Sequence, residues 1–140
     1  MTTEFENGHE ALTDATRLNL KGLSKSILRL HKTLLDGAKA EYEAQHGKIS
    51  SVNIYLQLVI DDPHFAWLRK LSSLVALFDE ATSLRRPASE SEAQALINEA
   101  KILLNFKDAD ESFNDKLQTA LQKNPDAVMS FNDAKNSLES

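Results

Sequence analysis

The chain has 140 residues, of which 41% are hydrophobic and 26% charged, so it is long enough to bury one core and too apolar to stay disordered. The absence of cysteine excludes a disulfide framework, a thiolate metal site and a cysteine nucleophile. A formal net charge of −5 argues against non-specific binding of nucleic acid, which requires an excess of lysine and arginine.

Residues 1–11 are expected to form a flexible tail, and residues 12–140 a single helical bundle domain. Residues 1–10 contain three glutamates and no apolar run, which is unlike a secretory signal peptide. The longest mostly apolar stretch, Val52 to Ile60, is less than half as long as a membrane-spanning helix. We therefore expect a cytoplasmic protein without a membrane span.

The first predicted element is a long amphipathic helix. Its apolar residues recur at alternating intervals of three and four, which places them on one helix face: Leu20, Leu23, Ile27, Leu30 and Leu34. We call these five residues the leucine seam. Thr13 or Asp14 is expected to cap the N-terminus of this helix, and Gly47 to end it.

Residues 51–61 are predicted to form a short buried helix. Six of the nine residues from Val52 to Ile60 are aliphatic, which leaves little polar surface. Alternation of apolar and polar residues over positions 52–58 also fits a β-strand, but a lone strand would have no pairing partner in this chain.

The third predicted helix begins at Pro63, with Asp62 as its N-cap, and ends at residues 85–87. Six of its apolar residues share one face and are expected to lie in the core: Trp67, Leu68, Leu71, Leu74, Val75 and Phe78. Trp67 is the only tryptophan, and its place on this face favours a core role over a role as a recognition anchor.

A capping box, Ser89-Glu-Ser-Glu92, predicts a fourth helix that continues to about Phe106. Two shorter helices are expected after it, one over residues 113–123 and one starting at Asn124-Pro125. The pattern therefore predicts an all-α fold, an antiparallel helical bundle of about four helices with short C-terminal helices packed against it.

The stretch Asp62-Pro63-His-Phe-Ala-Trp-Leu-Arg-Lys-Leu-Ser72, followed later by the turn Asn124-Pro-Asp-Ala-Val128, resembles a group of small bacterial helical proteins. That group shares a D-P-x-F-A-W-L-R-x-L-S motif, and the match covers about a third of this chain. The resemblance implies a bacterial cytosolic helical protein, and it implies no activity, cofactor or partner.

Leu20-Lys-Gly-Leu-Ser24 is similar to part of the motif of histidine phosphotransfer domains, which are helical bundles of comparable size. That motif has its phosphorylated histidine two residues before the leucine, where this chain has Leu18. Without an imidazole at this position there is no acceptor for phosphate, so phosphotransfer is not expected.

No catalytic motif is present: the sequence has no G-x-S-x-G elbow, no glycine-rich phosphate loop and no H-E-x-x-H pair. Glu43-x-x-His46 and Glu6-x-x-His9 have the spacing of di-iron ligands, but neither lies in the middle of a predicted bundle helix. We therefore expect a protein that is not an enzyme and has no cofactor. The alternative is a small-molecule, metal or haem-binding bundle with His31 and His64 as ligands from two helices.

The strongest functional candidate is a basic face on the first helix. Between Ala15 and Lys39 there are six cations and one anion, Asp36. Five of the cations lie on one side, nearly opposite the leucine seam: Arg17, Lys21, Lys25, Arg29 and Lys32. This basic face is either solvated or paired with acidic helices of its own chain, or it docks an acidic protein, or it meets an anionic membrane or nucleic acid, which the net charge disfavours.

A second apolar row runs beside the basic face and consists of Leu28, Leu35 and Tyr42. This row indicates that the helix packs on two sides or that part of it binds a partner. From these features we expect a non-catalytic, cytosolic interaction or regulatory module. It would bind a partner helix or form a homo-oligomer, with the basic face as the contact.

Overall fold

The computed structural model describes residues 10–139, and these residues fold into seven helices with no strand. The all-α class is therefore confirmed. The helices are α2 (Asp14–His46), α3 (Val52–Asp61), α4 (Pro63–Ala66), α5 (Arg69–Ala81), α6 (Glu90–Leu104), α7 (Glu111–Lys123) and α8 (Pro125–Glu139). The predicted tail lies mostly outside the described residues, as does the Glu6-x-x-His9 pair.

The long helix α2 begins and ends where the sequence predicts. The Thr13 hydroxyl accepts a hydrogen bond from the Thr16 amide at 3.1 Å, which satisfies one of the unpaired N–H groups of the first turn. At the other end Gly47 has a φ of 88°, a backbone conformation that side chains other than glycine rarely adopt.

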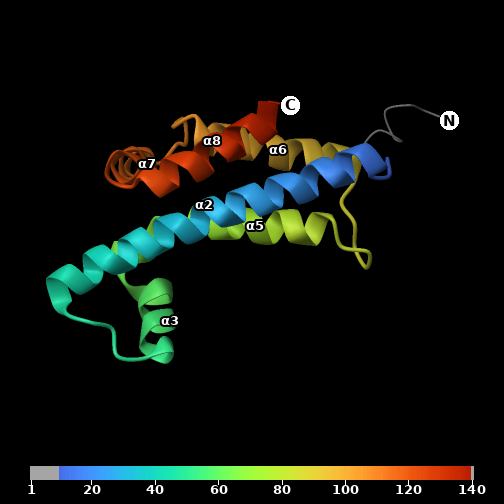
Figure 1. The fold of residues 1–140 in the computed structure, drawn as a ribbon. Helices are drawn as coiled ribbons and strands as arrows, with labels where there is room; N and C mark the ends of the chain where they lie inside the picture. The colour runs from blue at the N-terminus through green and yellow to red at the C-terminus, as the bar shows by residue number, and fades with distance from the viewer. Residues whose placement is uncertain (1–9, 140) are drawn as a thin grey trace.

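Helices α2, α5, α6 and α8 pack against one another, with α2 running through the centre of the view (Figure 1). Hydrogen bonds fix the pairing of α2 with α5, because Ser24 donates to Asp79 at 2.7 Å. Helix α8 lies on another side of α2, where the hydroxyls of Ser26 and Ser137 are 3.3 Å apart. Both neighbours run antiparallel to α2, since early residues of α2 meet late residues of each.

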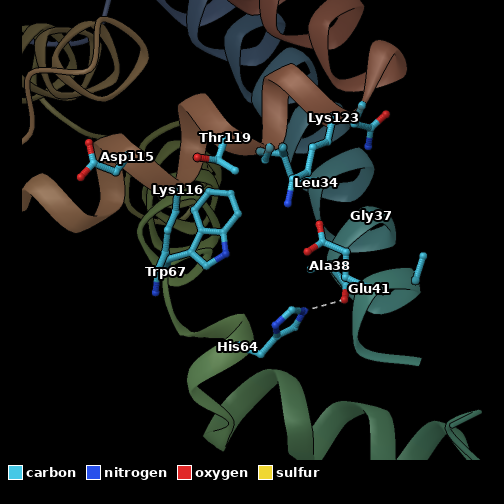
Figure 2. Close-up of a pocket in the computed structure, with 13 residues that line it drawn as sticks. Leu34, Gly37, Ala38, Glu41, His64, Trp67, Asp115, Lys116, Thr119 and Lys123 are labelled. Atoms are coloured by element: carbon cyan, nitrogen blue, oxygen red, sulfur yellow. Dashed lines mark hydrogen bonds between the residues drawn. The ribbon is translucent and has the colours of Figure 1, made fainter. Parts of the chain in front are cut away.

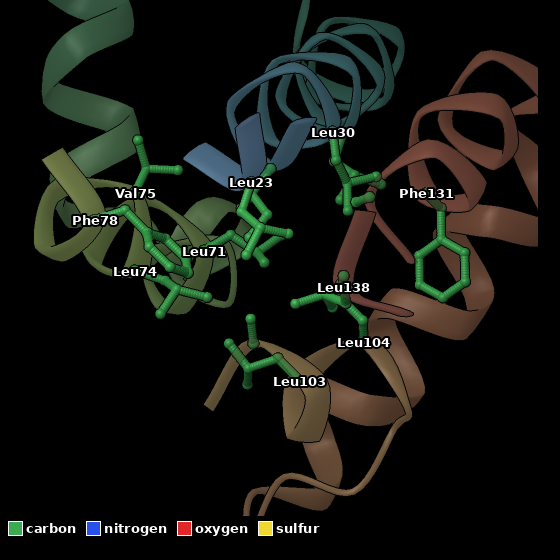
Figure 3. Packing of buried hydrophobic residues seen from close by; sticks show 14 of the residues in the cluster. Leu23, Leu30, Leu71, Leu74, Val75, Phe78, Leu103, Leu104, Phe131 and Leu138 are labelled. Carbon is green, nitrogen blue, oxygen red and sulfur yellow. The ribbon is translucent and has the colours of Figure 1, made fainter. Parts of the chain in front are cut away.

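The apolar faces of these four helices enclose the hydrophobic core (Figure 3). All five leucine-seam residues of α2 are buried, which confirms the helical spacing. The other helices contribute residues of matching periodicity, among them Leu71 and Phe78 from α5, Leu104 from α6, and Phe131 and Leu138 from α8.

Three expectations need correction. The predicted helix from Pro63 is divided at Trp67-Leu68 into α4 and α5, and Trp67 is only half-buried while Phe65 is fully buried. The helix begun by Asn124-Pro125 is no short accessory piece, because α8 is as long as α6 and packs against α2. The segment 51–61 is helical as predicted, but it is not buried: none of the residues of α3 is buried.

Helix α3 stands apart from the four packed helices, at the end of the molecule where α2 finishes (Figure 1). It follows an extended loop and packs chiefly against α4. No described helix is both long enough and apolar enough to cross a membrane.

Candidate functional site

Three of the five cations of the predicted basic face make contacts with other residues of the chain. The Arg17 guanidinium donates to the Thr82 carbonyl at 2.7 Å, which ties α2 to the end of α5. Arg29 lies 3.9 Å from Asp133 of α8, and Lys32 lies 3.2 Å from Asp36 one turn away. These three cations therefore have partners within the protein, and the two exposed ion pairs, those of Arg29 and Lys32, contribute about 0–1 kcal/mol each.

Lys21 and Lys25 are exposed members of the basic face. Among the described residues neither lysine has a hydrogen bond or an ion pair. The exposed side chains of Leu18 and Leu28 lie on the same side of α2. The solvent-facing part of the basic face is therefore a mixture of ammonium groups and apolar side chains.

The second apolar row of α2 does not form a continuous exposed surface. Leu28 is exposed, whereas Leu35 and Tyr42 are half-buried against the core. The Tyr42 ring lies 5.8 Å from the Phe65 ring, so its phenyl face packs where α4 meets α2. The C-terminal half of the row thus packs within the chain itself.

The two histidines considered as alternative metal ligands, His31 and His64, have separate environments in the structure. His64 bonds the Ala38 carbonyl through Nε2 at 2.8 Å, and because a carbonyl only accepts, Nε2 carries the proton and holds α4 against α2. His31 is half-buried on α2, and burial lowers its pKa below the ordinary value of 6.5. The described residues include no cluster of three or more histidine or carboxylate side chains that could hold a metal ion.

The Glu43-x-x-His46 pair also has local contacts. Glu43 accepts a hydrogen bond from the Ile49 amide at 2.9 Å, which holds the loop that follows α2. The His46 ring lies 4.5 Å from the Tyr42 ring on the preceding turn. Both residues thus contribute to the end of α2.

The feature that sequence reasoning missed is the exposed surface of α3. Its helical start is local: the Ser51 hydroxyl accepts from the Ile54 amide at 3.2 Å, and Asp62 follows as the C-cap. Residues 50–60 contain no charged side chain. The aliphatic composition indicated a core position, but α3 is held to the protein along one side only.

Only a few residues of α3 pack against the rest of the protein. The Tyr55 ring meets the Phe65 ring edge-on at 6.1 Å, and the Lys39 ammonium of α2 lies 5.0 Å from the centre of the Tyr55 ring. Leu58 and Val59 complete this side and are half-buried. Burial raises the pKa of the Tyr55 hydroxyl, and the charges of Asp36 and Glu43 raise it further.

The outer side of α3 carries an aliphatic row at intervals of four. Val52, Leu56 and Ile60 are 72%, 53% and 60% exposed, and successive members are rotated by only about 40° around the helix axis. We call these three residues the α3 row. Ile54 is 48% exposed and lies on another side of the same helix. The α3 row is therefore a strip of three exposed aliphatic side chains outside the core.

The fold and this surface define the class: within the described residues, an all-α protein that presents a largely apolar helix, α3, outside its packed core. No protein-family model, no curated protein and no solved structure matches the chain.

Proposed function

We propose that this chain is a cytoplasmic, non-catalytic protein-interaction module that self-associates through the α3 row. The observation that carries the proposal is the exposure of Val52, Leu56 and Ile60 on a helix that has no buried residue. Contiguous exposed apolar surface on a globular protein is typical of interaction sites.

A second copy of the chain is the partner that this surface fits. Rows at intervals of four form the ridges that interlock when two helices cross, and a two-fold pair presents the same ridge from both sides. No residue of the α3 row is charged, and Asp61, the charged residue of α3, lies about 100° around the helix axis from Ile60, so the rows of two copies meet through uncharged side chains. A surface selected for an acidic or basic partner would carry the opposite charge beside the apolar row.

The contact is small, so the association is expected to be reversible. A ten-residue helix is about 15 Å long and about 10 Å wide, well below the roughly 800 Å² per partner of a standard interface. In this proposal Lys21 and Lys25 of one copy attract the acidic parts of the other copy over a longer range. This is possible because the chain carries a net charge of −5 although the segment from Ala15 to Lys39 is basic.

The test is the concentration dependence of mass for the wild type and two exposure-matched variants of α3. Sedimentation velocity is expected to show wild-type protein moving from 15.6 kDa to twice that mass as its concentration rises. Leu56→Lys places an ammonium in the centre of the α3 row and is expected to leave the protein monomeric. Ile54→Lys adds the same charge on another side of α3 and is expected to preserve the dimer.

Neither variant removes a buried side chain, so circular dichroism and the midpoint of urea unfolding should match the wild type. Wild-type protein that stays monomeric at every accessible concentration would overturn self-association. Equal loss of the dimer in both variants, or in neither, would overturn the assignment to the α3 row.

A further inference from the structure

A pocket lies beside the core, between the C-terminal half of α2, Trp67 and α7 (Figure 2). It exists because α7 packs chiefly against α8, while α2 continues past it. Its volume is about 560 Å³. Sites for small molecules commonly measure about 300–1,000 Å³.

The inner wall of the pocket is apolar and includes one aromatic ring. Leu34 and Ala38 of α2 and Ala120 of α7 line the inner part. The Trp67 ring is half-buried and lies 6.1 Å from the ring of Phe113, which supports it. Trp67 also lines the pocket (Figure 2), which accounts for its incomplete burial and gives a ligand an aromatic surface to pack on.

Charged groups of both signs surround this wall. Glu41 comes from α2, and Asp115, Lys116 and Lys123 come from α7. Among the described residues none of these four side chains makes a hydrogen bond or an ion pair. Figure 2 shows Glu41 and Lys123 extending into the space between the two helices from opposite sides.

The polar residues at the pocket also include Thr119, Asn124 and His64, and the ring of His64 already has a hydrogen-bond partner. Its Nε2 donates to the Ala38 carbonyl, so the ring acts as a fixed part of the wall. The groups available to a ligand are therefore the carboxylate of Glu41 and the ammonium of Lys123 on opposite sides, the further charges of Asp115 and Lys116 on α7, and an indole ring with aliphatic side chains.

We propose that this pocket binds a small zwitterion with an apolar body, of the class of free amino acids with aromatic or large aliphatic side chains. The ammonium group of the ligand meets Glu41, its carboxylate meets Lys123, and its side chain packs on Trp67 and Leu34. A ligand with one charge would form a charge-assisted hydrogen bond with only one of these two side chains.

Trp67 is the only tryptophan, so its fluorescence reports on this pocket without interference from another indole. L-phenylalanine is the probe, with phenylacetate and phenethylamine as analogues that each keep one of its two charges. We expect a saturable change in Trp67 fluorescence with L-phenylalanine and affinities at least about tenfold weaker for both analogues. Calorimetric titration of the same three probes gives an independent affinity.

Two variants assign the charges, and a third is the control. Glu41→Gln is expected to weaken L-phenylalanine and phenethylamine by about tenfold and to spare phenylacetate, whereas Lys123→Gln is expected to weaken L-phenylalanine and phenylacetate and to spare phenethylamine. Lys101→Gln on α6 changes an exposed charge outside the pocket and should leave all three affinities unchanged.

An absence of saturable binding by every probe would overturn the proposal. Equal binding of the three probes, insensitive to Glu41→Gln and Lys123→Gln, would also overturn it. The result is independent of the α3 row, because Leu56→Lys lies outside the pocket and should bind L-phenylalanine as the wild type does.

Discussion

At the scale of single residues, His31 shows how the packing of α2 changes the chemistry of a side chain. It sits about 20° around the helix axis from Ser24, whose hydroxyl reaches Asp79 of α5, so His31 faces the same neighbouring helix. Burial there disfavours the charged imidazolium and lowers the pKa of the ring.

This shift makes the stability of the protein depend on pH. Below the ordinary histidine pKa of 6.5 the unfolded chain binds a proton at His31 that the folded chain does not, so the free energy of unfolding falls as the pH drops through 6.5. Urea unfolding between pH 7.5 and pH 5.5 should show this loss in the wild type and a smaller loss in His31→Gln. Parallel pH profiles for the two proteins would contradict the prediction.

Glycine at two positions of α2 gives a second test at this scale. A methyl group added at Gly22 meets no atom within 4 Å, whereas one added at Gly37 lies 3.0 Å from the side-chain amide nitrogen of Asn124. The Asn124 side chain also accepts from the Ala127 amide at 3.2 Å and so caps α8. Gly37 therefore allows α2 to approach the start of α8 closely.

Gly22→Ala is expected to raise the free energy of unfolding by about 0.5–1 kcal/mol, because alanine has the higher helix propensity. Gly37→Ala is expected to be less stable than Gly22→Ala by about 1 kcal/mol, since the methyl group displaces the cap of α8. Urea unfolding of both variants measures the difference, and equal stabilities would show that the Asn124 side chain moves aside at no cost.

At the scale of the elements, the start of a helix depends on residues close in the sequence, whereas the burial of a helix depends on residues far away in the sequence. Thr13, Ser51, Asp62 and Ser89 each accept a hydrogen bond from an amide two or three residues later, so a few neighbouring residues suffice to predict where a helix starts. Helix α3 shows the converse. Its aliphatic composition predicted burial, but whether a neighbouring helix covers it depends on residues far away in the sequence.

At the scale of the whole molecule, the separation of basic and acidic segments predicts salt-dependent assembly. Lys21→Glu with Lys25→Glu reverses two exposed charges that have no partner among the described residues, so the free energy of unfolding should change by no more than about 0.5 kcal/mol. Assembly should weaken at low salt and approach the wild-type level at high salt, because salt screens exposed charges.

Sedimentation velocity at two salt concentrations measures this effect, with Leu56→Lys as the comparison that should prevent assembly at both. Arg29 is left unchanged because its reversal would also place two carboxylates together at Asp133. Unaltered assembly of the double variant at low salt would show that Lys21 and Lys25 contribute no attraction between the copies.

The sequence by itself determined the all-α class, the caps of the main helices and the leucine seam of α2, because these depend on helical periodicity and on hydrogen bonds between near neighbours. Only the tertiary structure decided that Arg17 and Arg29 have partners, that Trp67 lines a pocket, and that the α3 row is exposed. Each of these depends on which distant segments come together. At these positions pairing and burial are set by the packed chain, and the local pattern of residues does not encode them.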